Sequence, residues 1–292
     1  MLQPLQLIQP ETVQEASQAM THFGDKAKLY AGGAELLLLL RNRLIDAEVL
    51  IDLKKIDRLR RLDAINGILR IGACLTHHEV ASSPAIRERA PAFALAESQL
   101  ANVRVRNQGT LGGNLAFNDP HSDPGTVLLL HDASVTLGDA KGERRLALAE
   151  FFVDMYATAL QAGELLLEVE IPRLPAGMTS SYLRLHRYQR PTLGVAAAAR
   201  ITKEIIDEAR LAVGCIGPKA QRLSELEGKI RGVRLSEVGK FFAEQRTYLR
   251  DLLQPVDDLL GGADYKLYMA GVLLGDALEQ AGHGMMGESS ES

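Results

Sequence analysis

Two pairs of adjacent glycines, Gly32-Gly33 and Gly112-Gly113, constrain the fold of this 292-residue chain more than any other feature. Glycine has no Cβ atom, so the backbone N–H groups of such a pair can approach an anion closely, and a following helix adds a partial positive charge. One pair between a strand and a helix is usually an ordinary turn. Two pairs together indicate a site suited to a diphosphate.

The sequence around each pair excludes two well-known nucleotide loops. Neither pair follows G-x-G-x-x-G, and the chain lacks G-x-x-x-x-G-K-S/T, so neither a Rossmann nor a Walker-type site is supported. The first motif, Ala31-Gly32-Gly33-Ala34-Glu35, lies between a predicted strand at 28–31 and a predicted helix at 35–43. The second motif, Gly109-Thr110-Leu111-Gly112-Gly113-Asn114, lies in a predicted loop at 102–124.

Charge and apolar patterning exclude several classes of protein. Lys and Arg total 33 and Asp and Glu total 37, a net charge of −4, which provides no broad positive field for nucleic acid. The longest unbroken apolar runs, such as Leu36–Leu40, are far shorter than the roughly 20 residues of a membrane span. The first residues do not show a basic segment followed by an apolar one. We therefore expect a cytoplasmic protein without a transmembrane segment.

The chain has two cysteines, Cys74 and Cys215, each within an apolar stretch. Two thiols cannot supply a four-thiolate iron–sulfur cluster or a framework of two disulfides. We expect both to be small buried hydrophobic residues, and any such cluster to belong to a partner chain.

The remaining pattern predicts an α+β chain with two domains. Thr12 and Glu15 form a capping box at the start of a helix, and Asn66-Gly67 is typical of a tight hairpin turn. Two prolines and a glycine within 172–177 indicate a domain boundary. Further strands are predicted at 2–8, 49–53, 164–170, 182–190, 195–202 and 205–214, and further helices at 77–82, 92–100, 235–246 and 265–280.

Three other groups of polar residues were weighed for function. Adjacent side chains on a helix point about 100° apart, so His77-His78-Glu79 does not predict a metal site. His121-Ser122-Asp123 does not predict a hydrolase, because sequence neighbours seldom form a triad and no G-x-S-x-G motif is present. Arg104 and Arg106 can reach a phosphate or a partner's carboxylate, or can be solvated. We predict no metal ligand and no catalytic side chain.

The order and spacing of several motifs resemble one known family. These motifs are Ala31-Gly32-Gly33, Ile71-Gly72-Ala73, the run from Arg106 to Asn114, Ser122-Asp123-Pro124 and Ile171-Pro172. Together they resemble the FAD-binding subunit of the molybdenum hydroxylases, the family of xanthine dehydrogenase and aerobic carbon monoxide dehydrogenase. The resemblance implies a fold like that of vanillyl-alcohol oxidase and p-cresol methylhydroxylase, in which two α+β subdomains hold FAD and a smaller α+β domain follows.

The implied domain limits are 1–175 for the FAD-binding domain, with subdomains at about 1–53 and 54–175, and 178–281 for the C-terminal domain. The tail at 282–292 has no apolar periodicity, and we expect it to be disordered.

The resemblance also implies a set of FAD-binding residues. The two glycine motifs would hold the diphosphate through backbone N–H groups. Asp123 matches a residue at the ribose or adenine end, although it can instead cap the turn before Pro124. Leu166 matches a residue against the adenine and Arg184 a cation near the flavin, although core packing and solvation explain them equally well. The implied set is Ala31, Gly32, Gly33, Ala34, Glu35, Leu36, Thr110, Leu111, Gly112, Gly113, Asn114, Asp123, Leu166 and Arg184.

Two segments depart from the family pattern. Ala34-Glu35 stands where relatives usually carry a small polar residue or His followed by Asp or Ser. Glu35 would repel a diphosphate unless it points outward or binds a ribose hydroxyl. Thr192-Leu193-Gly194 replaces an Asp, an aromatic or aliphatic residue and an Ala, so the flavin potential and the electron acceptor cannot be inferred from relatives.

The function implied is electron transfer through FAD within a hetero-oligomer. A large partner chain would carry the molybdopterin cofactor and a small one two [2Fe-2S] clusters, and a dimer of such heterotrimers is one assembly consistent with the family. Two alternatives stay open. The chain can be a self-contained FAD oxidase of the same fold, or a non-redox assembly subunit whose altered Ala34-Glu35 loop no longer holds flavin.

Overall fold

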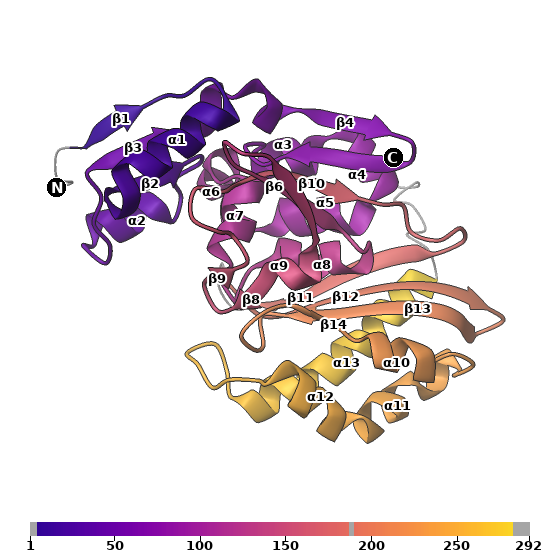
Figure 1. Cartoon of the computed structure of the whole chain (residues 1–292). Coiled ribbons are helices and arrows are strands. Elements are labelled where there is room, and N and C mark those ends of the chain that lie inside the picture. The colour runs from indigo at the N-terminus through magenta and orange to yellow at the C-terminus, as the bar shows by residue number, and fades with distance from the viewer. Residues whose placement is uncertain (1–4, 187–189, 283–292) are drawn as a thin grey trace, which may run out of the picture.

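The computed structural model describes residues 5–186 and 190–282, which form three units arranged along the chain (Figure 1). The predicted tail at 282–292 lies outside the described residues except for Gly282. None of the helices in these two ranges is long and apolar enough to cross a membrane.

The N-terminal unit is a small parallel sheet in the order β1-β3-β2. The predicted capping box is confirmed, since the Thr12 hydroxyl accepts from the Glu15 N–H and the Glu15 carboxylate accepts from the Thr12 N–H. Its elements are β1 (Gln6–Ile8), α1 (Val13–Phe23), β2 (Ala27–Tyr30), α2 (Leu36–Arg41) and β3 (Val49–Asp52), with a 3-10 turn at Gly24–Lys26.

The central unit contains a five-stranded antiparallel sheet in the order β4-β5-β10-β6-β7. The predicted Asn66-Gly67 turn joins β4 and β5, and both residues have positive φ angles of 51° and 81°, as this turn type requires. The strands are β4 (Leu62–Ile65), β5 (Ile68–Gly72), β6 (Ser134–Gly138), β7 (Glu143–Ala147), β10 (Leu165–Ile171) and the separate hairpin β8 (Phe152–Asp154) and β9 (Ala157–Thr158).

Helices pack on this sheet and enclose an apolar core. They are α3 (His77–Ser82), α4 (Pro84–Arg89), α5 (Pro91–Gln99), α6 (Val103–Gln108), α7 (Leu111–Phe117), α8 (Asp123–Leu130) and α9 (Leu148–Phe151). Two 3-10 turns, Leu53–Lys55 and Asp57–Arg60, connect the N-terminal unit to β4.

The predicted loop at 102–124 is wrong, because most of it is helical. Asn102 caps α6 by accepting from the N–H groups of Arg104 and Val105 at 3.0 and 3.1 Å. Thr110 caps α7 by accepting from the Gly113 N–H at 3.2 Å. Helices of six to eight residues are too short to show an apolar period, so the Gly, Asn and Pro residues between and within them dominated the sequence pattern.

The C-terminal unit is an antiparallel sheet in the order β11-β12-β13-β14 (Figure 1). One face packs on α8 and contributes Tyr182, Ala196 and Ala198 to the central core. The other face is covered by the C-terminal helices. The elements are β11 (Thr179–His186), β12 (Pro191–Thr202), β13 (Ile205–Gly214), β14 (Gln221–Arg222), α10 (Ser224–Lys229), a 3-10 turn (Leu235–Glu237), α11 (Val238–Glu244), α12 (Arg246–Leu253) and α13 (Ala263–Gly282).

Several predicted limits need correction here. The strand predicted at 182–190 ends at His186 in the described residues, and positions 187–189 lie outside them. The single helix predicted at 235–246 is a 3-10 turn followed by the shorter α11.

We predict that Gly112→Ala destabilises the chain by about 1–3 kcal/mol. Gly112 packs on β5's end, and a Cβ atom there would overlap the Cβ of Ala73 and lie 2.7 Å from its carbonyl oxygen. Gly239→Ala in α11 is the matched control, since a Cβ atom there meets nothing within 4 Å. Urea unfolding of both variants measures the difference, and equal stability of Gly112→Ala and the parent would contradict the close packing.

Candidate functional site

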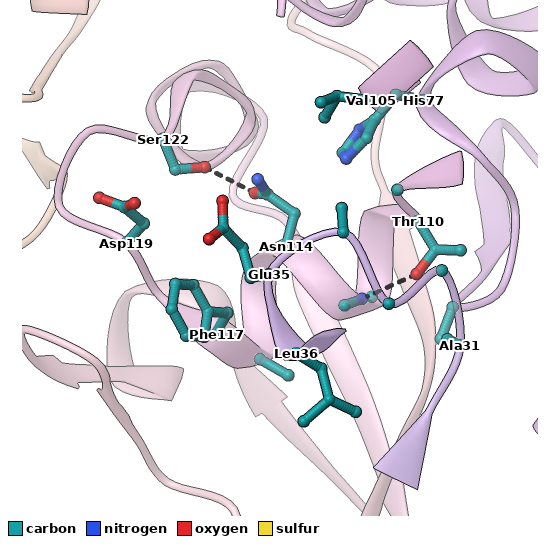
Figure 2. A pocket seen from close by; sticks show the side chains of 18 of the residues that line it. Ala31, Glu35, Leu36, His77, Val105, Thr110, Asn114, Phe117, Asp119 and Ser122 are labelled. Atoms are coloured by element: carbon teal, nitrogen blue, oxygen red, sulfur yellow. Dashed lines mark hydrogen bonds between the residues drawn. The ribbon is translucent and has the colours of Figure 1, made fainter. Parts of the chain in front are cut away.

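A cavity of about 450 Å³ opens between the N-terminal and central units and reaches the start of β12. The first glycine motif, the start of α7 and the residues just before α8 form its walls (Figure 2). All but two of the residues predicted from the sequence line this one cavity. They are Ala31, Gly32, Gly33, Ala34, Glu35, Leu36, Thr110, Gly112, Gly113, Asn114, Asp123 and Leu166.

Glycine is required where the two motifs meet. A Cβ atom on Gly32 would overlap the carbonyl oxygen of Gln108 and lie 2.9 Å from the Cα of Gly109. Gly33 has a φ angle of +75°, in the left-handed region that favours glycine. The first pair of glycines therefore lets one loop cross directly over the other.

The two motifs differ in the backbone donors that they can offer an anion. In the second motif the N–H groups of Leu111 and Gly112 each donate at 2.9 Å to a carbonyl of the segment at 73–75. The Gly113 N–H donates to the Thr110 hydroxyl. In the first motif, the N–H groups of Ala34 and Glu35 donate to no protein acceptor within residues 5–186 and 190–282. The first motif therefore offers backbone N–H donors to an anion, whereas the N–H groups of the second motif are used to hold the cavity wall in shape.

Two predicted residues lie behind the cavity wall. Leu111 is fully buried in the central core. The Arg184 side chain is only 4% exposed, and its Nη1 lies 3.3 Å from Oδ2 of Asp123. Solvation of Arg184, one of the two readings of this position, is therefore wrong.

Asp123 is buried at the first position of α8 and is held by β11. It accepts a hydrogen bond from the Tyr182 hydroxyl and pairs with Arg184. Burial raises the pKa of the Asp123 carboxyl to about 6, although the Arg184 charge and the Tyr182 hydrogen bond act in the opposite direction. The carboxylate joins two units, and among the described residues it makes no hydrogen bond that caps the turn before Pro124.

A row of charges runs along the mouth of the cavity. Arg190 lies between Glu35 and Asp119, with N···O distances of 3.6 and 3.0 Å. Burial opposes ionisation of Asp119, but its hydrogen bond with His121 and the Arg190 charge hold the pKa of this carboxyl below its ordinary value. Glu35 is 40% exposed, and Figure 2 shows it on the side of the cavity where Asn114 and Asp119 lie.

The row continues into the C-terminal unit. The Nε2 of His121 lies 3.0 Å from Oδ2 of Asp258, to which the fully buried Lys266 donates at 2.5 Å. The Asp119 hydrogen bond raises the pKa of His121 against the effect of burial, and the Asp258 hydrogen bond acts in the same direction. Ser122 donates to Oδ1 of Asn114 at 2.6 Å, so His121 and Ser122 do not form a nucleophile pair.

Sequence reasoning missed Arg190 and Asp119. Each occupies a segment without a motif, and they meet only because β12 begins beside the cavity. No signal in the sequence alone identifies this pairing.

Two protein-family models match this chain, one in its N-terminal part and one in its C-terminal part. Residues 3–174 match the FAD binding domain in molybdopterin dehydrogenase. The chain belongs to the FAD-binding medium subunits of the molybdenum hydroxylase family. Residues 182–281 match the CO dehydrogenase flavoprotein C-terminal domain. The predicted α+β fold with an FAD-binding domain and a following C-terminal domain is therefore confirmed, as is FAD as the cofactor of the first domain.

Relatives of this medium subunit cover nearly its whole length. The carbon monoxide dehydrogenase medium chain of Hydrogenophaga pseudoflava is 31% identical over 279 residues, 93% of this chain and 95% of that protein. The nicotine 6-hydroxylase medium subunit of Paenarthrobacter nicotinovorans is 29% identical, with 94% and 95% covered. A solved chain of quinoline 2-oxidoreductase from Pseudomonas putida 86 is 26% identical, with a TM-score of 0.90 and 98% and 100% covered.

The cavity of this medium subunit fits FAD chemically. The first glycine motif supplies unused N–H groups for a diphosphate, and Leu100 and Leu166 add apolar surface for a ring. Glu35, which departs from the family pattern, lies 3.6 Å from Arg190, and the same guanidinium also pairs with Asp119.

We predict that the stability of Asp123→Asn relative to the parent depends on pH. The folded-state pKa of Asp123, about 6, exceeds its ordinary value of 3.8. The native state therefore binds more protons than the unfolded state between these values, so the parent loses stability as pH rises through this window. Relative to the variant, the parent should gain about 1–3 kcal/mol between pH 6.5 and pH 4. Unfolding free energies measured at both values test this, and a constant difference would contradict it.

We predict that Arg190→Gln weakens FAD binding about two- to fivefold, because Glu35 and Asp119 are left without their shared cation. Glu35→Gln should change the affinity less, and the double variant should bind more tightly than Arg190→Gln alone. Quenching of FAD fluorescence measures all four proteins. Unchanged affinity of Arg190→Gln would show that the row of charges does not act on the cofactor.

Proposed function

We propose that this chain is the electron-transfer flavoprotein of a molybdenum hydroxylase complex. Electrons would arrive from [2Fe-2S] clusters on a small partner chain, pass through FAD, and leave to an external acceptor. A large partner chain would carry the molybdopterin cofactor and oxidise the organic substrate. FAD suits this task because it exchanges electrons singly or in pairs.

The observation that carries the proposal is the meeting of both glycine motifs at one cavity. In it we assign the diphosphate to the first motif, whose N–H groups are unused, and polar anchorage to Asn114 and Asp123. Leu166 supplies an apolar wall, and Arg184 acts through Asp123 rather than on the cofactor directly. The proposed domains remain 1–175 and 178–281.

The names of the relatives support placing substrate selection on another chain. The medium subunits of carbon monoxide dehydrogenase and nicotine 6-hydroxylase are 31% and 29% identical to this chain, and the beta subunit of caffeine dehydrogenase is 28% identical. The similarity therefore does not follow the size or polarity of the substrate. A chain that only relays electrons needs no pocket for the substrate, which agrees with this pattern.

The deciding experiment combines cofactor binding with reduction. The full chain is loaded with FAD, freed of excess, and mixed without oxygen with the reduced iron–sulfur chain of its complex. We expect one FAD per chain and rapid loss of the oxidised flavin absorbance, with no loss when the iron–sulfur chain is omitted.

Two other outcomes would overturn the proposal. Oxidation of a small organic substrate by the isolated flavoprotein would identify a self-contained oxidase. Failure to hold FAD both alone and in the assembled complex would identify a non-redox assembly subunit.

A further inference from the structure

A buried histidine that the motifs did not explain faces the FAD cavity. His77 opens α3, and its side chain is only 3% exposed, whereas the adjacent His78 is exposed. Its Nδ1 lies 2.6 Å from Oε2 of Glu97, a fully buried carboxylate on α5. The other oxygen of Glu97 has no hydrogen-bond partner within the part of the chain that the structure describes. The pair therefore places His77 in the cavity wall with the Glu97 carboxylate buried behind it.

The ring of His77 lies against the second glycine motif. The His77 N–H donates to the Gly109 carbonyl at 3.1 Å. A Cβ atom on Gly109 would lie 3.1 Å from Cδ2 and 3.3 Å from Nε2 of the ring. Figure 2 shows the ring directed toward the space beside Thr110 and Asn114. Glycine at position 109 therefore leaves room for the Nε2 edge.

The Nε2 atom is the polar side-chain atom that this part of the cavity has to spare. It makes no hydrogen bond within residues 5–186 and 190–282. The other lining side chains able to carry positive charge are engaged elsewhere. Arg190 pairs with Glu35 and Asp119, and His121 pairs with the same Asp119 and with Asp258. Lys28 donates to the Asp25 carbonyl at the surface.

A buried pair of this kind costs desolvation energy that a ligand can offset. When Nδ1 donates to a carboxylate, Nε2 can donate as well only in the imidazolium form, for which Glu97 is the counter-ion. A charged N–H donor matches an anionic oxygen better than a hydroxyl or a ring nitrogen. The ligand chemistry that this edge favours is therefore phosphate.

We propose that His77 is a cofactor-binding residue whose Nε2–H donates to a diphosphate oxygen of the dinucleotide, and that Glu97 is a positioning residue that holds the ring. This inference depends on the proposed FAD site and adds a side-chain donor opposite the first glycine motif.

Two variants at position 77 separate ligand binding from a structural role. In His77→Asn the amide can replace Nδ1 toward Glu97 but does not reach the Nε2 position. In His77→Gln the amide reaches the Nε2 position but loses the short contact with Glu97. Calorimetric titration of the full, FAD-free chain with ADP and with adenosine reports the diphosphate and the nucleoside separately.

We expect His77→Asn to weaken ADP binding about 10- to 100-fold and to leave adenosine binding nearly unchanged. His77→Gln should keep more of the ADP affinity than His77→Asn. Thermal unfolding of both apo variants provides the control for folding. If the His77–Glu97 pair were purely structural, His77→Gln would lose more ADP affinity than His77→Asn, because His77→Gln disturbs the contact with Glu97 more.

A second measurement needs no variant. In the parent labelled with 15N-histidine, the Nε2 signal of one buried histidine should move on addition of ADP and stay in place with adenosine. The inference would be overturned if His77→Asn bound ADP as tightly as the parent does, or if it lost ADP and adenosine binding equally. It would also be overturned if no histidine signal moved on addition of ADP. If the parent binds no FAD, alone or in the complex, the proposed function itself fails.

Discussion

The close crossing of two backbone segments at Gly32 and Gln108 is the constraint on which the site depends. A side chain at position 32 would overlap the Gln108 carbonyl, so the N-terminal sheet can meet the central unit only with glycine there. That contact forms one wall of the cavity, and the N–H groups of Ala34 and Glu35 in this wall have no protein acceptor within the described residues. Glycine is thus needed at this point for the assembly of two units as much as for any ligand.

The third unit completes the site through one buried carboxylate. Tyr182 and Arg184 of β11 both contact Asp123 on α8, and the row from Arg190 to Lys266 makes a second link at the mouth. Ion pairs between buried partners tolerate little displacement, since separation leaves a desolvated charge. The C-terminal unit therefore helps to fix the cavity even though few of its residues line it.

Local rules predicted local features well. The Thr12–Glu15 capping box and the Asn66-Gly67 turn depend on neighbours in the chain, and the structure has both. The sequence pattern did not predict the helices between 102 and 124, because each spans only about two turns and begins at a capping residue that also suits a loop. Twelve of the residues that line the cavity followed from motif order. Arg190 lines it only through tertiary packing, and Glu97 lies behind it through its contact with His77.

An inner strand of the C-terminal sheet, β12, sets the thickness of the layer between α8 and the outer helices. Positions 195–199 of β12 are one valine and four alanines, buried on both faces. Methyl groups fill so little space that α8 and α13 approach the same strand closely and leave no room for sliding. A single layer of small side chains therefore separates the outer helices from α8, whose first residue lines the cavity.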